Sequence, residues 1–168
     1  HYGCRIVFDP HGYLFFAIGD CGRPEHAQVL SRPNGKIHRI HRDGSVPSDN
    51  PFAHLKHILP TIYSYGHRNP QGMAVQPHTG RIWITEHGPL GGDELNLVSP
   101  GRNYGWPVIS YGRNYDGTLI TEFETRAGME QPILYWKPSI AVCGLNFYRG
   151  IMFPKWRGKL LAGSLKYE

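Results

Sequence analysis

The sequence predicts an all-β protein built from repeated antiparallel hairpins. Of its 168 residues, 21 are glycine and 14 are proline, while only 18% are charged. Short apolar runs alternate with turn residues, and the spacing typical of amphipathic helices is scarce. Hydrophobic residues make up 40% of the chain, which excludes a disordered polymer and is enough to form one core.

Three segments share one pattern, an apolar strand, a turn containing glycine and a second apolar strand. They are residues 5–10 with 12–20, residues 72–77 with 80–86, and residues 144–148 with 158–166. The turn residues Gly12, Gly80 and Gly158 are 68 and 78 residues apart, longer than the roughly 40–50 residues of a simple blade. We therefore expect insertions within each unit. The repetition favours propeller blades, although a β-sandwich would contain the same hairpins.

Polar residues cluster at the same end of every predicted hairpin. They precede the first strand and follow the second: His1, Arg5 and Asp20, then Arg68, Asn69, Glu86 and His87, and finally Lys166. In an antiparallel hairpin, the start of one strand and the end of the next lie at one edge. Around a common axis, these side chains would converge on one mouth, which is where we expect a ligand to bind.

Charge and residue spacing argue against several other functions. The formal charge is +5, and basic residues concentrate between Arg32 and Arg42. Polar and apolar residues alternate over residues 36–40 (KIHRI), which suits an exposed strand face. A solvated face is favoured over a nucleic-acid site, because no groove-binding or stacking motif accompanies the basic residues. Cys4, Cys21 and Cys143 lack metal-ligand spacing, and the ten histidines include no HExxH pattern. No apolar run reaches the roughly 20 residues needed to span a membrane.

An ordered set of glycine- and proline-containing motifs runs nearly from end to end. The set comprises HYGCR at 1–5, GDCGR at 19–23, GK at 35–36, DGSVP at 43–47, DNP at 49–51, GHRNPQG at 66–72, EHGP at 86–89, GDELN at 92–96 and NYGWP at 103–107. Together they resemble the soluble quinoprotein glucose/sorbosone dehydrogenases, most closely the periplasmic aldose sugar dehydrogenase branch.

The resemblance implies a six-bladed β-propeller with pyrroloquinoline quinone (PQQ) and Ca²⁺ at its axial mouth. Because the chain starts at His1 rather than Met and ends at a strand, we expect a fragment. It would be a single partial domain, residues 1–168, with antiparallel four-stranded blades, covering about half the ring and lacking the N- and C-terminal blades. The family also implies a periplasmic or secreted protein, with any signal outside this fragment.

The implied reaction is oxidation of the C1 hydroxyl of an aldose to a lactone, with hydride transfer to PQQ. The catalytic residues implied by the resemblance are His1 and Arg68. A histidine suits proton removal near neutral pH, although a lone His1 would otherwise be interpreted as a surface residue. A guanidinium such as that of Arg68 stays charged and forks onto carboxylate or quinone oxygens.

The resemblance also implies a cofactor and metal shell. Its cofactor-binding residues are Arg68, Asn69, His87, Lys166, Ser139 and Ala141. Gly88 and Pro89 would supply carbonyl oxygens to the cofactor's Ca²⁺, which prefers oxygen ligands, and Glu94 with the Tyr104 carbonyl would bind a second Ca²⁺. From the residues alone, Gly88-Pro89 is interpreted as an ordinary turn. Glu94 is as well explained by capping a turn as by binding a metal. Trp136, which lies near Ser139 in the sequence, is interpreted as a core residue.

The expected partners are an aldose and an external electron acceptor, with no nucleic acid and no membrane span; a homodimer stays an open alternative. One competing function is a non-enzymatic, calcium-binding propeller that acts as a protein-interaction module. A binding module has no reason to keep His1, Arg68, Asn69 and Lys166 together, which favours the enzyme. A metal lactonase would need several carboxylates around one metal, and the strand tips offer too few.

Overall fold

The computed structural model describes residues 1–166, which form three antiparallel sheets in chain order. The first sheet has the strand order β1-β2-β3-β4. Its strands are β1 (Ile6–Phe8), β2 (Leu14–Ile18), β3 (Lys36–Ile40) and β4 (Ile62–Tyr65). The second sheet has the order β5-β6-β7-β8. Its strands are β5 (Pro70–Val75), β6 (Ile82–Glu86), β7 (Asp93–Val98) and β8 (Leu134–Trp136).

The third sheet pairs β9 (Val142–Phe147) with β10 (Leu160–Ser164). Two short 3-10 helices lie in connections, η1 (Pro24–Gln28) and η2 (Pro154–Trp156), and neither these nor any other segment among residues 1–166 makes a helix able to span a membrane. Tyr167 and Glu168, the last two residues of the predicted domain, lie outside the described residues. Cys4, Cys21 and Cys143 are free.

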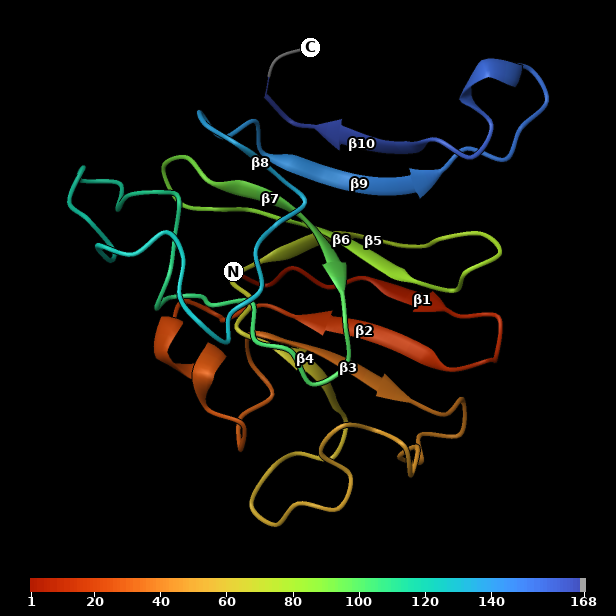
Figure 1. Ribbon diagram of the computed structural model, residues 1–168, viewed down its shortest axis with the longest axis horizontal. Helices are drawn as coiled ribbons and strands as arrows, with labels where there is room; N and C mark the ends of the chain where they lie inside the picture. Colours follow the sequence, from red (N-terminus) through yellow and green to blue (C-terminus); the bar gives the residue numbers. More distant parts are fainter. Residues whose placement is uncertain (167–168) are drawn as a thin grey trace.

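The three predicted hairpins are confirmed as β1-β2, β5-β6 and β9-β10. Their turn glycines Gly12, Gly80 and Gly158 have φ of 86°, 70° and 77°, a left-handed conformation that favours glycine. Figure 1 shows the sheets stacked one above another, with these turns on the right and the N-terminus on the opposite side. The strand tips with the polar residues therefore share one end of the stack.

The main core lies between the first two sheets. It joins Phe15, Ala17 and Ile37 of the first sheet to residues of β5, β6 and β7; the latter are Met73, Ile82, Ile84 and Val98. In β2, burial alternates along Leu14–Ile18, as the two-residue period of a strand requires. The first strands of successive sheets lie together, β1 against β5 and β5 against β9, which is the arrangement of blades around an axis.

Strand β3 corrects one expectation, because its polar side chains are buried rather than solvated. Lys36 is fully buried and its Nζ donates to the carbonyls of His26, Ala27 and Asn34 at 2.7–3.0 Å. His38 is 2% exposed and stacks on Phe16. The inserted segments before and after β3 cover it and supply hydrogen-bond partners. A sequence pattern with period two distinguishes the two faces of a strand, but it does not show which face the rest of the chain covers.

Arg39 is buried in the same strand by the same insertions. Its guanidinium donates to Asn50 and Asp49 at 2.6 Å and lies over the rings of Tyr13 and Tyr63.

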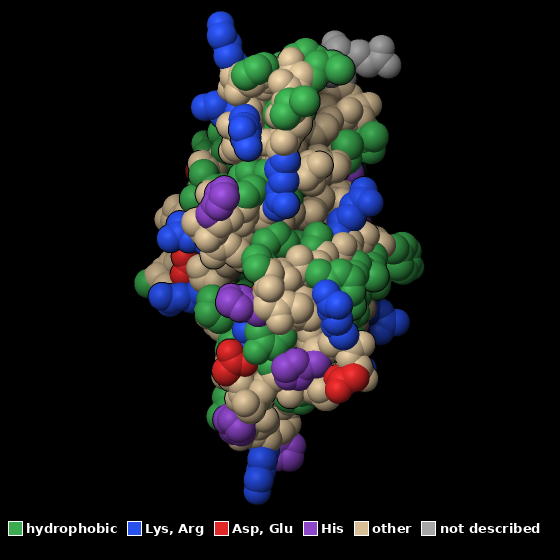
Figure 2. All heavy atoms as spheres, turned by 90° about the vertical axis from the view of Figure 1, so that its right-hand side faces the viewer, with side chains coloured by type: hydrophobic (Ala, Val, Ile, Leu, Met, Phe, Trp, Pro, Cys, Tyr) green, Lys and Arg blue, Asp and Glu red, His purple; other side chains and the backbone are tan. Residues whose placement is uncertain are grey.

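Figure 2, which views the right-hand side of Figure 1, shows Lys, Arg and His side chains dispersed among apolar and neutral surface rather than gathered into one patch. On the face in view, the positive charge is therefore spread out.

Candidate active site at the strand tips

His1 and Asp20 form a hydrogen-bonded pair at the polar end of the first hairpin. The distance between His1 Nδ1 and Asp20 Oδ1 is 2.6 Å, with the Asp20 side chain fully buried and that of His1 29% exposed. Gly19 permits this approach, because a Cβ there would lie 2.4 Å from the carbonyl oxygen of His1. A buried carboxylate on Nδ1 fixes the ring orientation and leaves Nε2 for a substrate proton.

Trp106 joins this pair to Arg68. Its Nε1 donates to the second oxygen of Asp20, Oδ2, at 2.9 Å. The guanidinium carbon of Arg68 lies 5.3 Å from the centre of its ring, within cation–π range. The backbones are tied as well, since the Asp20 amide donates to the Arg68 carbonyl at 2.9 Å. Sequence reasoning missed Trp106 as a site residue, because nothing in the NYGWP motif itself shows where the indole points.

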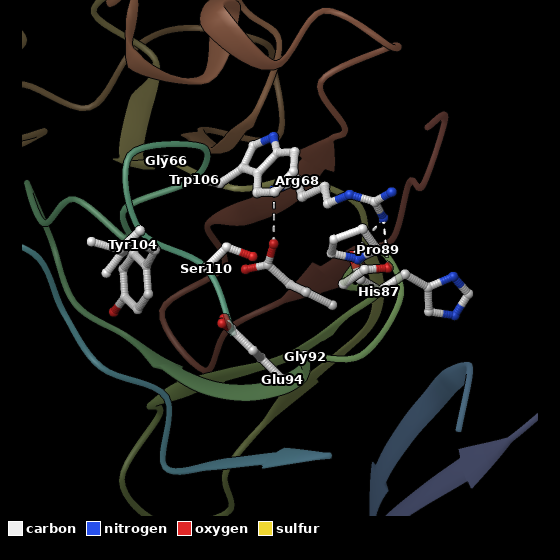
Figure 3. Close-up of a pocket in the computed structure, with 12 residues that line it drawn as sticks. Gly66, Arg68, His87, Pro89, Gly92, Glu94, Tyr104, Trp106 and Ser110 are labelled. Carbon is white, nitrogen blue, oxygen red and sulfur yellow. Dashed lines mark hydrogen bonds between the residues drawn. The ribbon is translucent and has the colours of Figure 1, made fainter. Parts of the chain in front are cut away.

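Arg68 also holds the turn after β6. Its Nη1 donates to the carbonyl oxygens of His87 and Gly88 at 2.9 and 2.8 Å. Arg68 is 6% exposed, and its buried Nε has no partner among the described residues. Figure 3 shows the Arg68 side chain reaching from beside Trp106 to the turn of His87 and Pro89. Arg68 therefore contacts both Trp106 and the turn after β6.

A buried polar network behind Arg68 was also missed. His67 Nδ1 lies 2.6 Å from Glu86 Oε1, and His67 Nε2 lies 2.8 Å from the Ser64 hydroxyl. The second oxygen of Glu86 accepts the Arg68 amide at 2.9 Å. The atoms resemble a nucleophilic triad, but Ser64 and His67 are both fully buried. The network instead fixes the backbone that carries Arg68.

Two neighbouring spaces open beside this cluster. The inner recess, about 20 Å³, has room for about one water-sized species; it is lined by Gly66, Arg68, Glu86, His87, Gly88, Pro89, Gly92, Glu94, Tyr104, Trp106, Ile109 and Ser110. The outer hollow, about 540 Å³, is lined by His87, Gly88, Pro89, Leu90, Gly91, Asp93, Tyr115, Lys137, Pro138, Ser139, Ala141 and Lys166. The turn of residues 87–89 forms the wall between them.

These spaces gather most of the predicted cofactor shell. His87, Ser139, Ala141 and Lys166 line the outer hollow, and the buried Nε2 of His87 has no partner among residues 1–166. Asn69 is not among the described residues lining either space. Its Oδ1 instead accepts the Gly3 amide at 3.0 Å, which ties the N-terminal segment to β5. Asn69 as a cofactor ligand stays a prediction, as do the roles of the others.

The predicted metal ligands also lie along these walls. Gly88 O accepts from Arg68 at 2.8 Å and Pro89 O from the Ser139 hydroxyl at 3.3 Å. Glu94 and Tyr104 both line the inner recess. Burial, followed by the charge of Glu86, raises the pKa of Glu94 to about 8. Trp136 ends β8 opposite Asp93 and is not among the described residues that line the two spaces.

The comparisons with known proteins agree with this geometry. The family model described as "Glucose / Sorbosone dehydrogenase" matches residues 1–168. The chain belongs to this family. It is 48% identical over 168 residues to the aldose sugar dehydrogenase YliI of Escherichia coli (strain K12), covering 99% of this chain and 45% of that protein. The chain therefore spans about half the length of the curated relatives it matches.

Solved structures share the fold of this chain. A glucose dehydrogenase crystal structure matches with a TM-score of 0.96 and 46% identity, covering 98% of this chain and 48% of that one. The PQQ-bound aldose sugar dehydrogenase of Streptomyces coelicolor matches with a TM-score of 0.74 and 30% identity, covering 99% of this chain and 42% of that one. The prediction of part of a β-propeller with antiparallel four-stranded blades is confirmed.

Proposed function

We propose that this chain supplies the base and part of the cofactor site of an enzyme that oxidises the C1 hydroxyl of aldoses to lactones. The observation that carries the proposal is the contact chain His1–Asp20–Trp106–Arg68. It places an oriented imidazole at the same strand tips as a buried cation. The sugar dehydrogenase names and the PQQ-bound structure among its relatives support the proposal.

The donors at the mouth fit PQQ, an anionic, flat, tricarboxylate quinone. Arg68 Nε and His87 Nε2 are buried nitrogens without a partner among the described residues, and such orphaned groups are costly unless a ligand satisfies them. Lys166 lines the outer hollow, where Ser139 and Ala141 also lie. We assign these residues to holding the cofactor. When bound, PQQ supplies the quinone that accepts the hydride from C1.

The chain's own residues then perform the proton chemistry. His1 Nε2 takes the proton of the sugar's C1 hydroxyl as the C1 hydrogen leaves as hydride, so the hydroxyl oxygen becomes the lactone carbonyl. Asp20, which holds Nδ1, stabilises the imidazolium that forms. Arg68 adds positive charge where negative charge develops. An external electron acceptor must reoxidise the cofactor after each turnover.

Two Ca²⁺ sites belong to the proposal. Gly88 and Pro89 line the spaces on both sides of their turn, and backbone carbonyl oxygens are ligands that Ca²⁺ accepts. Glu94 and Glu86 share the amide of Asn96, at 3.0 and 3.3 Å, so two carboxyl groups meet at the inner recess. A divalent ion there would favour the ionised carboxylate and so oppose the burial and the charge of Glu86 that raise the pKa of Glu94. Tyr104 would add its carbonyl.

The remaining assignments follow from the same resemblance. We propose that residues 1–168 are one partial propeller domain of a periplasmic or secreted enzyme.

The test of the proposed function is to reconstitute the full-length parent protein with PQQ and Ca²⁺ and to measure reduction of a redox dye by a panel of aldoses. Dye reduction that requires both the sugar and PQQ is expected. A protein that binds PQQ but oxidises no aldose would contradict the proposal.

A further inference from the structure

Trp106 is the side chain that connects the His1–Asp20 pair to the Arg68 guanidinium. It is half-buried and comes from the connection between β7 and β8, whereas its two partners come from the β2–η1 and β4–β5 connections. Its amide donates to the Gly66 carbonyl at 3.0 Å, which fixes the indole's backbone to the segment that carries Arg68. Three connections far apart in sequence therefore meet at one ring.

We infer that Trp106 is a positioning residue for the proposed dehydrogenase reaction. By donating to Asp20 it sets how strongly that carboxylate acts on His1, and its ring holds the Arg68 guanidinium in place. The inference rests on the proposed function for its kinetic consequences. The contact itself rests on the geometry alone, so the two can fail separately.

The physical argument concerns the two oxygens of Asp20. Oδ1 receives the Gly22 amide at 2.8 Å and faces His1, while Oδ2 receives the Trp106 indole at 2.9 Å. The Trp106 indole contacts two charged side chains, the Asp20 carboxylate and the Arg68 guanidinium. Removing the indole N–H leaves the buried carboxylate under-satisfied, which favours the protonated form of the neighbouring imidazole. A base held in its protonated form accepts no substrate proton.

Trp83 offers a matched control. Its side chain is also half-buried, and its Nε1 donates to Gln76 Oε1 at 3.2 Å, close to the β5–β6 turn at the opposite end of the sheet. Trp→Phe at either position removes one indole N–H and keeps an aromatic face. A difference between the two variants therefore reports the contact with Asp20 rather than the general loss of an indole.

The contact can be tested without cofactor or substrate. In the apo form of the intact protein, ¹H–¹⁵N spectra resolve the indole N–H of Trp106, assigned by its loss in Trp106→Phe. Asp20→Ala should move this signal upfield and speed its solvent exchange, while the Trp83 signal stays in place. If Asp20→Ala does not fold, Asp20→Asn keeps a neutral acceptor and should move the signal in the same direction. An unmoved Trp106 signal would overturn the inference.

Kinetics then test the consequence. Trp106→Phe should lower kcat about tenfold, as expected for losing a hydrogen bond to a charged group, and shift the acid limb of the kcat/KM profile to higher pH. PQQ affinity should change less than about threefold, because Arg68 keeps an aromatic ring beneath it. Trp83→Phe should behave as wild type.

The outcomes separate the two ideas. If the wild-type protein oxidises no aldose, the proposed function is wrong. The ¹H–¹⁵N spectra still test the contact between Trp106 and Asp20 in that case. Active wild type with Trp106→Phe matching Trp83→Phe in kcat and pH profile overturns the positioning role. A fall in kcat without any shift of the acid limb of the pH profile also overturns the positioning role, because a merely structural defect would lower kcat in the same way.

Discussion

The imidazole of His1 is held by the fully buried carboxylate of Asp20, at 2.6 Å between Nδ1 and Oδ1. The two residues are 19 positions apart, and the antiparallel pairing of β1 with β2 brings their ends together. The sheet thus fixes the orientation of the proposed base before any substrate arrives. Such preorganisation lowers the cost of proton transfer.

Replacing Arg68 by Ala should weaken PQQ binding and reduce activity at least tenfold. The variant would lose the proposed charge-assisted contact to the cofactor, and such a contact is worth about 1.5–3 kcal/mol. Arg32→Ala is the matched control, because Arg32 is exposed and its side chain makes no hydrogen bond, ion pair or ring contact with other described residues. PQQ titration of both variants, followed by dye reduction, checks this; equal losses would mean that Arg68 is not a site residue.

Arg39→Ala should instead lower the free energy of unfolding, by about 2 kcal/mol or more. It removes hydrogen bonds to Asn50 and Asp49 and two cation–π contacts, and it leaves Asn50 buried with one partner fewer. Urea unfolding of the intact protein measures the change, with Arg32→Ala again as the control. A stability within 0.5 kcal/mol of wild type, which is about the range of surface substitutions, would show that the cluster contributes little.

Lys36 should make stability depend on pH. Burial lowers the pKa of Lys36 from 10.5 to about 7, so between these values the unfolded chain binds more protons than the folded one. Stability from this group therefore rises as pH increases from about 7 towards 10 and stays low below 7. Lys36→Met removes the effect. Unfolding measured across this range should show wild type gaining on the variant as pH rises; parallel curves would contradict the assignment.

The sequence could predict the hairpins and the common edge of the polar residues, because glycine turns and strand alternation are local signals. Gly12, Gly80 and Gly158 all occupy the turns expected of them. Burial of Lys36 and Arg39 was not predictable in this way, since it depends on insertions folding back over β3. Trp106 and the His67–Glu86 pair were missed for the same reason: their partners lie 86 and 19 residues away, and local patterns carry no such pairing.

The family resemblance supplied what local patterns lacked, and its residue assignments differ in their structural support. Lys166 and His87 line one hollow with Ser139 and Ala141. Asn69 is directed to the Gly3 amide through its Oδ1, which a sequence match alone does not reveal. Asn69→Ala is therefore expected to disturb the N-terminal segment as well as any ligand, and is a poor test of cofactor binding.

The most direct test of the account is His1→Ala in the intact, PQQ- and Ca²⁺-loaded protein. Turnover should fall by about 10²–10⁴-fold, the usual contribution of a general base. PQQ should stay bound, because Arg68, His87 and Lys166 are the residues proposed to hold it. The variant would then show the absorbance of the bound quinone but negligible bleaching or dye reduction on addition of an aldose. Oxidation of aldoses at a rate near that of wild type would show that the base lies elsewhere.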